Sequence, residues 1–224
     1  MPYFNEEFII FFQNLEKNNN KEWFDVNRTI YEKFVKKPFT NFIHDIIQQL
    51  SEIDEPIPYE AKQLIFRINR DIRFSQDKTP YKTHSSALVS PMGRKNMYYP
   101  GMYIEASHVN LKIYGGSYQL DKNQLYTLRK YLCDYPQDFE KALDDSDFKK
   151  TYGSIHGEKN KVLPSEFKAC AESQPIIYNK NIYYFKKFDP YEILNDNLMD
   201  TVIKTFMAGA SIRNLLKMAL SEVE

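Results

Sequence analysis

Apolar residues recur at helical spacing over the first fifty positions of the chain. A first run follows Asn5, a residue type that caps helices, and it ends at the three asparagines of residues 18–20. A second run begins near Asn20 and continues to about Ser51, with Pro38 predicted to kink it or to start a new helix. The pattern therefore predicts a helical N-terminal region.

The middle of the chain changes to a period of two. Apolar and polar residues alternate from residue 61 to residue 68, which is typical of a half-buried strand. Further strand-like runs follow at residues 83–89, 97–106 and 109–114. Gly115 and Gly116 are predicted to form a turn after the last of these runs. Short connections between the runs favour an antiparallel sheet.

Helical patterns return after the predicted sheet. Asp121 and Gln124 have the spacing of a capping box, and a second short helix is expected over residues 136–143. A short strand is predicted at residues 182–185, and an amphipathic helix broken near Gly209 is predicted at residues 198–220. The whole pattern predicts an α+β fold with a central, mostly antiparallel sheet flanked by N- and C-terminal helices. We expect residues 1–224 to form a single domain.

Composition narrows the classes of protein that fit. Only 7 of the 224 residues are Gly, which argues against a glycine-rich nucleotide loop, and Lys plus Arg (30) equals Asp plus Glu (30). A neutral total does not favour nucleic acid as a partner, although a local basic patch is compatible with it. We expect the two cysteines to be free thiols in a reducing compartment, with a disulfide between them as the alternative.

The ends and the apolar runs of the chain carry no sign of membrane targeting. No signal-peptide pattern is present at the N-terminus, and no run approaches the roughly 18 apolar residues that span a bilayer. We therefore expect a cytoplasmic protein with no membrane partner. Nothing in the pattern specifies an oligomeric state.

The segment from Arg67 to His84 concentrates charge. It holds five Lys or Arg residues against two Asp residues, a surplus of +3 in a chain whose total is zero. Turn-forming residues at 77–80 predict a loop, and we expect Ile72 and Phe74 to anchor that loop to the core.

Three interpretations of this loop remain open. In the first, Asp71 and Asp77 pair with the cations, and the loop is a structural ion-pair network. In the second, the surplus cations bind a phosphate or carboxylate group. The proposed ligand-binding residues are Arg67, Arg70, Arg73, Lys78 and Lys82, with Tyr81 as a hydroxyl donor.

The third interpretation is catalysis. His84 has the residue type of a general acid or base, and Asp71 is a candidate to share the proton transfer. No activated nucleophile is evident. The four histidines are scattered, so no metal site and no cofactor is predicted. Glu105 falls in a predicted strand and is expected to face the same side as Arg67 if the register allows.

Two motifs resemble a known family. Residues 18–24 (NNNKEWF), and above all residues 70–83 (RDIRFSQDKTPYKT), resemble the domain of unknown function 2461 family of conserved hypothetical proteins of bacteria and fungi. The resemblance covers nearly the whole chain and implies no established activity. It also implies that Asn27 and Arg28 belong with the charged loop and line the same pocket, whereas Trp23 is expected to pack in the core.

We therefore predict a protein that binds an anionic small molecule through the charged loop. The alternatives are a hydrolase or transferase acting on a phosphorylated substrate, and a protein-interaction module whose loop is purely structural.

Overall fold

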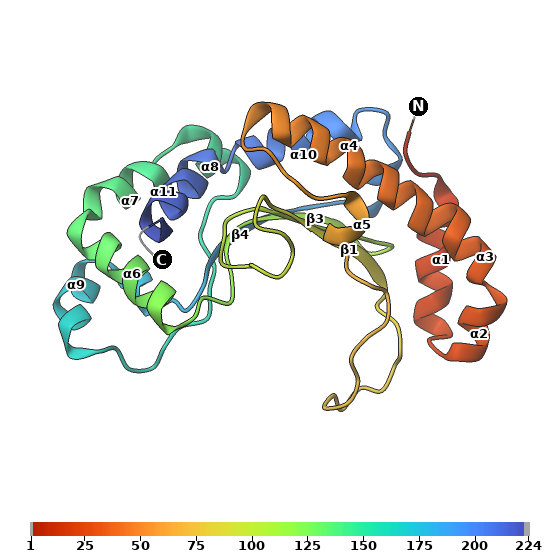
Figure 1. Ribbon diagram of the computed structural model, residues 1–224, viewed down its shortest axis with the longest axis horizontal. Helices are drawn as coiled ribbons and strands as arrows, with labels where there is room; N and C mark the ends of the chain where they lie inside the picture. Colours follow the sequence, from red (N-terminus) through yellow and green to blue (C-terminus); the bar gives the residue numbers. More distant parts are fainter. Residues whose placement is uncertain (1, 222–224) are drawn as a thin grey trace. The chain divides into compact units, whose positions relative to one another are not determined.

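The chain folds into helices around a four-stranded sheet (Figure 1). The computed structural model describes residues 2–221. The strands are β1 (His84–Val89), β2 (Met102–Ser107), β3 (Leu111–Ser117) and β4 (Ile182–Phe188). They pair in chain order as an antiparallel sheet, and the prediction of an α+β fold is confirmed.

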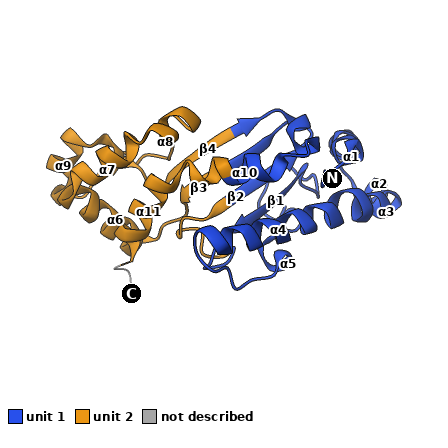
Figure 2. Cartoon of the chain, turned by 90° about the horizontal axis from the view of Figure 1, so that it is seen from above, with its two compact units in different colours: residues 1–94, 103–113, 187–203 blue, residues 95–102, 114–186, 204–224 orange. Residues whose placement is uncertain are grey.

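The chain divides into two compact units (Figure 2). Unit 1 comprises residues 1–94, 103–113 and 187–203, and unit 2 comprises residues 95–102, 114–186 and 204–224. Neither unit is one continuous segment of sequence. The prediction of a single domain stays a prediction.

Unit 1 begins with the predicted helices. They are α1 (Glu6–Lys17), α2 (Lys21–Val26), α3 (Arg28–Ile30), a π-helical turn (Tyr31–Lys36) and α4 (Lys37–Ile53). Pro38 is the second residue of α4, which continues directly from the π-helical turn. Buried Phe residues pack edge to face between these helices; the ring centroids of Phe11 in α1 and Phe24 in α2, for example, are 6.3 Å apart.

The strand predicted at residues 61–68 is wrong over its first half. Residues Ala61–Leu64 form a short helix, α5, because Glu60 and Gln63 make a reciprocal capping box. The Glu60 N–H donates to the Gln63 side chain at 2.8 Å. Only Ile65 keeps a strand-like bridge there, to Ala87 of β1.

The turn predicted at Gly115–Gly116 is also wrong, because both residues lie inside β3. Gly116 has a φ of +111°, and a Cβ there would come within 2.2 Å of the Ile182 carbonyl oxygen. The glycine thus allows β4 to approach closely, which is a strand role for Gly rather than a turn role. Residues 97–101, predicted to begin a strand, precede β2 and are not extended strand.

Unit 2 holds most of the C-terminal helices. They are α6 (Lys122–Asp134), α7 (Pro136–Leu143), α8 (Ser146–Thr151), α9 (Lys168–Ser173) and α11 (Ala210–Leu220). Short 3-10 turns of unit 2 occupy Ser165–Phe167 and Pro175–Tyr178. A third 3-10 turn, Pro190–Leu194, lies in unit 1, and α10 (Leu198–Met207), which begins in unit 1, precedes α11. The Asp121–Gln124 capping box and the break near Gly209 are confirmed.

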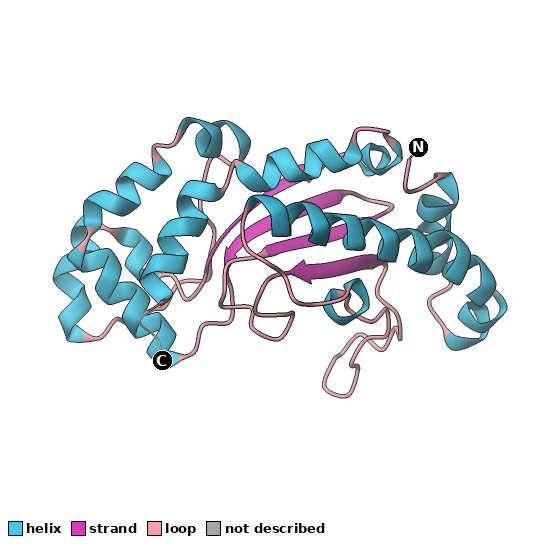
Figure 3. Cartoon of the chain, turned by 45° about the horizontal axis from the view of Figure 1, so that its top comes forward, coloured by secondary structure: helices cyan, strands magenta, loops and turns pink. Residues whose placement is uncertain are grey.

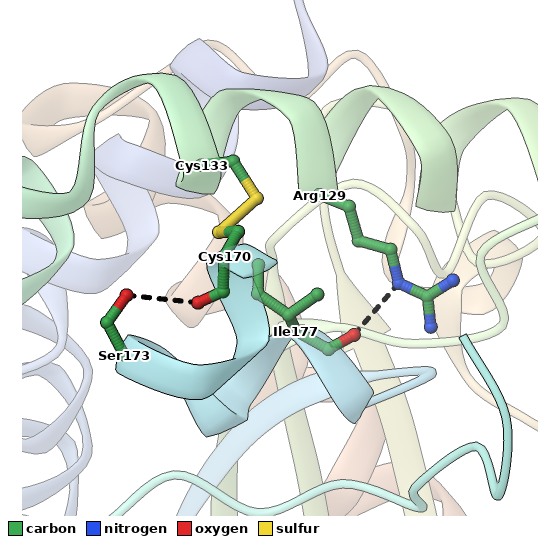
Figure 4. Close-up of a disulfide and its surroundings, with 5 residues drawn as sticks. All are labelled: Arg129, Cys133, Cys170, Ser173 and Ile177. Carbon is green, nitrogen blue, oxygen red and sulfur yellow. Dashed lines mark hydrogen bonds between the residues drawn. A yellow bond between two sulfur atoms is a disulfide. The ribbon is translucent and has the colours of Figure 1, made fainter. Parts of the chain in front are cut away.

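The two cysteines form a disulfide between α6 and α9 (Figure 4). Cys133 and Cys170 are partly buried against the core of unit 2, and the expectation of free thiols is wrong. The two cysteines are 37 residues apart in the sequence, and this separation does not reveal that α6 packs beside α9. Disulfides persist in oxidising surroundings, so the predicted reducing compartment stays untested.

One face of the sheet in unit 1 is covered by α4, which packs against β1 (Figure 3). A long hairpin leaves the sheet at β1 on the opposite side from α4 (Figure 1). Within residues 2–221, no helix is long and apolar enough to cross a membrane.

Candidate functional site

The charged segment is the outer part of an antiparallel hairpin. Asn69 bridges Tyr81, the Arg70 N–H donates to the Pro80 carbonyl at 2.8 Å, and the Lys82 N–H donates to the Ile68 carbonyl at 2.8 Å. We call residues 70–79 the hairpin tip and residues 65–69 with 80–84 the hairpin base. The charged side chains of these two parts differ in how they are paired.

Both arginines of the hairpin tip are paired with aspartates of the tip. Arg70 pairs with Asp77 at 2.5 Å and also donates to Thr79. The Arg73 guanidinium donates hydrogen bonds to both carboxylate oxygens of Asp71, at 2.9 and 2.6 Å. Lys78 donates to the Ile72 carbonyl at 2.9 Å. The tip is therefore an ion-pair network of the kind that the first interpretation describes.

The acids of the tip titrate far below their usual range. The hydrogen bonds from Arg73 lower the pKa of Asp71 to about 2. The Thr79 N–H, and then the Arg70 guanidinium, lower the pKa of Asp77 to about 2. Both carboxylates thus stay ionised, and both ion pairs persist, at any physiological pH.

Phe74 does not anchor the hairpin, contrary to the prediction. Its side chain is 96% exposed, and its ring lies 5.9 Å from the Arg73 guanidinium. Ile72, the other residue predicted to anchor the hairpin, is half-buried, and its anchoring role stays a prediction. The ion pairs link the residues of the tip to one another.

Tyr81 faces the N-terminal helices. It is buried and stacks on Phe24 of α2 with a centroid distance of 4.1 Å. The Asn19 side chain donates to the Tyr81 carbonyl at 2.9 Å and accepts from the Tyr81 N–H at 3.0 Å. This double hydrogen bond attaches the hairpin to the segment just before α2.

Arg28 lies near Tyr81, because its guanidinium is 5.4 Å from the centroid of the Phe24 ring that stacks on Tyr81. Asn27 donates to the Trp23 carbonyl at 2.9 Å, and Arg28 pairs with Asp25 at 2.5 Å. Burial raises the pKa of Tyr81, and the positive charge of Arg28 opposes this increase. Trp23 packs against Phe11 at 5.6 Å. The structure therefore groups Arg28 with Tyr81.

A row of ionisable side chains crosses three neighbouring strands. Glu105 of β2 lies between His84 of β1 and Lys112 of β3. Its Oε2 is 3.8 Å from His84 Nε2, and its Oε1 accepts from Lys112 Nζ at 3.3 Å. All three side chains are less than 30% exposed, at 27%, 18% and 25% for His84, Glu105 and Lys112.

Two further cations gather at Phe66 in the hairpin base. Lys82 Nζ lies 5.3 Å and the Arg94 guanidinium 5.8 Å from the centroid of the Phe66 ring. Arg94 also donates to the Ile65 carbonyl.

We name these residues, together with Arg67, the sheet cluster; its members are Phe66, Arg67, Lys82, His84, Arg94, Glu105 and Lys112. Arg67 is exposed and is included because its charge acts on Lys82, although it also acts on Asp71 of the hairpin tip. Burial, followed by the charge of Arg67, lowers the pKa of Lys82, and Glu105 opposes this effect. Burial also lowers the pKa of His84, so its imidazole is neutral at pH 7.

The sheet cluster has an uncompensated positive charge. Four cations stand against one carboxylate, and with His84 neutral the difference is 4 − 1 = +3. Within residues 2–221, neither Arg67, Lys82 nor Arg94 has a carboxylate oxygen within 4.0 Å. The arrangement can receive an anion, whereas the described residues contain no group of three or more acidic, His or Cys side chains suited to a metal.

A family model of conserved hypothetical proteins, DUF2461, matches residues 7–214. The chain belongs to this family. Comparison with curated proteins gives no match. The match confirms the resemblance seen in the sequence, and it includes the whole hairpin and every member of the sheet cluster.

Sequence reasoning found only part of the sheet cluster. Arg67, Lys82 and His84 were among the candidates, and Glu105 was expected on their side. Arg94 and Lys112 were missed. Lys112 had a signal, since it is a polar position within an alternating run, but its neighbour across the sheet depends on strand order. Asp71 and His84, proposed to share a proton, contact different partners: Arg73 and Glu105 respectively.

Proposed function

We propose that this protein binds a phosphate- or carboxylate-bearing small molecule at the sheet cluster. The observation that carries the proposal is the convergence of Lys82 and Arg94 on one ring, beside a single carboxylate. An oxyanion between these two groups would receive charge-assisted hydrogen bonds from both.

The cost of the unliganded arrangement supports the proposal. A half-buried ammonium without a counter-ion is less stable than the same group in water, which is why the pKa of Lys82 is lowered. An anion would restore the missing partner. The lowered pKa of Lys82 should then rise when the ligand binds.

We propose fewer ligand-binding residues than the sequence suggested. Arg70, Arg73 and Lys78 already donate to partners inside the hairpin tip. We therefore propose Lys82, Arg94 and Arg67 as the principal ligands, with Lys112 contributing charge. Tyr81, Asn27 and Arg28 would stabilise the hairpin from its other side.

Thermal unfolding in phosphate tests this proposal. Phosphate should raise the midpoint relative to chloride at equal ionic strength, since a ligand that binds only the folded state stabilises it by mass action. The increase should vanish in Lys82→Ala and persist in Arg73→Ala, whose cation is lost from an exposed pair. An increase that is equal in both variants would contradict the proposal.

Catalysis at the same site is the second candidate, and the His84–Glu105 pair favours it. A neutral imidazole beside a carboxylate can accept a proton from water or a hydroxyl, with Glu105 stabilising the imidazolium that forms. Such a pair would suit hydrolysis or transfer of a phosphoryl group held by the cations. Turnover of a generic phosphate ester that disappears in His84→Gln, with unfolding unchanged, would support this candidate.

A further inference from the structure

Glu105 is the acidic member of a cluster that otherwise holds cations and a neutral histidine. One oxygen, Oε1, accepts a hydrogen bond from Lys112 at 3.3 Å. The other, Oε2, is 3.8 Å from His84 Nε2, which is beyond hydrogen-bond distance. With 18% of the side chain exposed, this second oxygen still has acceptor capacity.

A carboxylate at this position works against the binding of a bare oxyanion. Like charges in a half-buried site repel, so Glu105 weakens binding of any ligand that offers only an anion. The same carboxylate strengthens binding when the ligand also offers a hydrogen-bond donor. A site built around such an acceptor discriminates strongly against analogues without the donor.

The charge of the cluster decides what kind of donor fits. A ligand ammonium would meet four cations, and Lys112 already occupies one side of Glu105. A hydroxyl group is a neutral donor and avoids this repulsion. The surplus of +3 also accommodates a dianionic phosphate better than a monoanionic carboxylate.

We propose that the ligand is a phosphate monoester with a hydroxyl group close to its phosphate. Lys82 and Arg94 would hold the phosphate, and Glu105 Oε2 would accept the hydroxyl proton in a hydrogen bond. This inference rests on the proposed function and specifies the substrate class for the same site.

Two ligands that differ only in hydroxyl groups test the inference. Glycerol 3-phosphate and propyl phosphate share the phosphate and a three-carbon chain, and calorimetric titration of the full chain gives an affinity for each. Glycerol 3-phosphate should bind at least about tenfold more tightly, the effect of one hydrogen bond to a charged group.

Variants of Glu105 assign that preference to one side chain. Glu105→Gln removes the charge and should tighten binding of propyl phosphate and inorganic phosphate. Glu105→Leu removes the acceptor and should reduce the preference for glycerol 3-phosphate to about onefold. Asp71→Asn is the matched control, an acid of the hairpin tip whose loss should leave the tenfold preference unchanged.

The outcomes separate this inference from the proposal on which it rests. If inorganic phosphate and both esters fail to bind, the anion site itself is wrong. If phosphate and both esters bind with equal affinity to the unaltered protein, the site stands and the hydroxyl requirement is overturned. If the preference survives in Glu105→Leu, a different residue accepts the hydroxyl. The unaltered protein alone distinguishes the first two results, even where a variant fails to fold.

Discussion

The hairpin tip and the sheet cluster contain similar numbers of charges and use them in opposite ways. At the tip, each arginine has its own aspartate and Lys78 has a carbonyl oxygen. The sheet cluster holds one glutamate for four cations, and of these Lys112 donates a hydrogen bond to it. A high density of Arg and Lys in sequence therefore says little about binding until the pairing of each cation is known.

Solvent exposure adds to the contrast. The Arg73–Asp71 pair has side chains 76% and 47% exposed, so water competes with it and its contribution to stability is small. Glu105 and Lys112 are mostly buried, where a charge costs more when it is unpaired and interacts more strongly when it is paired. The second environment suits recognition of an anion.

The largest effect should come from reversing a charge in the sheet cluster. Lys82→Glu removes a charge-assisted hydrogen bond and adds repulsion, so phosphate affinity should fall roughly 100-fold, about 3 kcal/mol. Exchanging the tip pair, Asp71→Arg with Arg73→Asp, keeps both charges and should leave the affinity unchanged. Calorimetric titration of both proteins with phosphate makes the comparison, and equal losses would show that the two regions act alike.

His84 should give the sheet cluster a pH dependence that the tip does not have. Well above the ordinary histidine pKa of about 6.5, the imidazole is neutral in both the folded and the unfolded chain, and it does not affect stability. Below that pH the unfolded chain binds a proton that folded His84 resists, because its pKa is lowered by burial. Stability should therefore fall with acidification, by at most about 1.4 kcal/mol per pH unit from this residue.

Denaturant unfolding of the unaltered protein and of His84→Gln between pH 5 and 8 measures this slope. The other three histidines are common to both proteins, so their contributions cancel. Parallel stability curves would contradict the lowered pKa of His84.

A change at the tip should loosen the hairpin locally. Arg70→Ala removes the hydrogen bonds to Thr79 and the pair with Asp77. Limited proteolysis between residues 71 and 78 should accelerate roughly fivefold, as expected for the loss of about 1 kcal/mol of local stability. Phosphate affinity should stay within twofold, and a larger loss would mean that the tip takes part in binding.

The smallest effect is expected at the most exposed apolar side chain. Phe74→Ser should change the free energy of unfolding by no more than about 0.5 kcal/mol, because the ring contacts no core residue. A loss above 1 kcal/mol in denaturant unfolding would restore the anchoring role that the sequence suggested.

Local chemistry made several elements of the fold predictable. The acidic first turn of α1, the Asp121–Gln124 box and the alternation in β3 each depend on neighbours in sequence. Residues 61–64 were mispredicted because the Glu60–Gln63 box outweighed the period-two pattern. Gly115 and Gly116 looked like a turn because the close approach of β4 comes from residues almost seventy positions later.

The sequence predicted which types of residue make up the candidate site. It did not predict which of the charged residues in the hairpin belong to that site. Sequence identified Lys82, Arg67 and His84, yet it ranked Arg70 and Arg73 equally with them. Which cations are neutralised depends on the path of the hairpin backbone. The contribution of Arg94 depends on a loop that returns to Phe66, and that of Lys112 on the pairing of β3 with β2.

A crystal structure grown with selenate tests the central claim most directly, because selenium gives an anomalous signal at the position of the oxyanion. The account predicts a peak whose oxygens lie about 3 Å from Lys82 Nζ and the Arg94 guanidinium. Selenate bound only at Arg73 or Lys78, with none at Lys82, would contradict it.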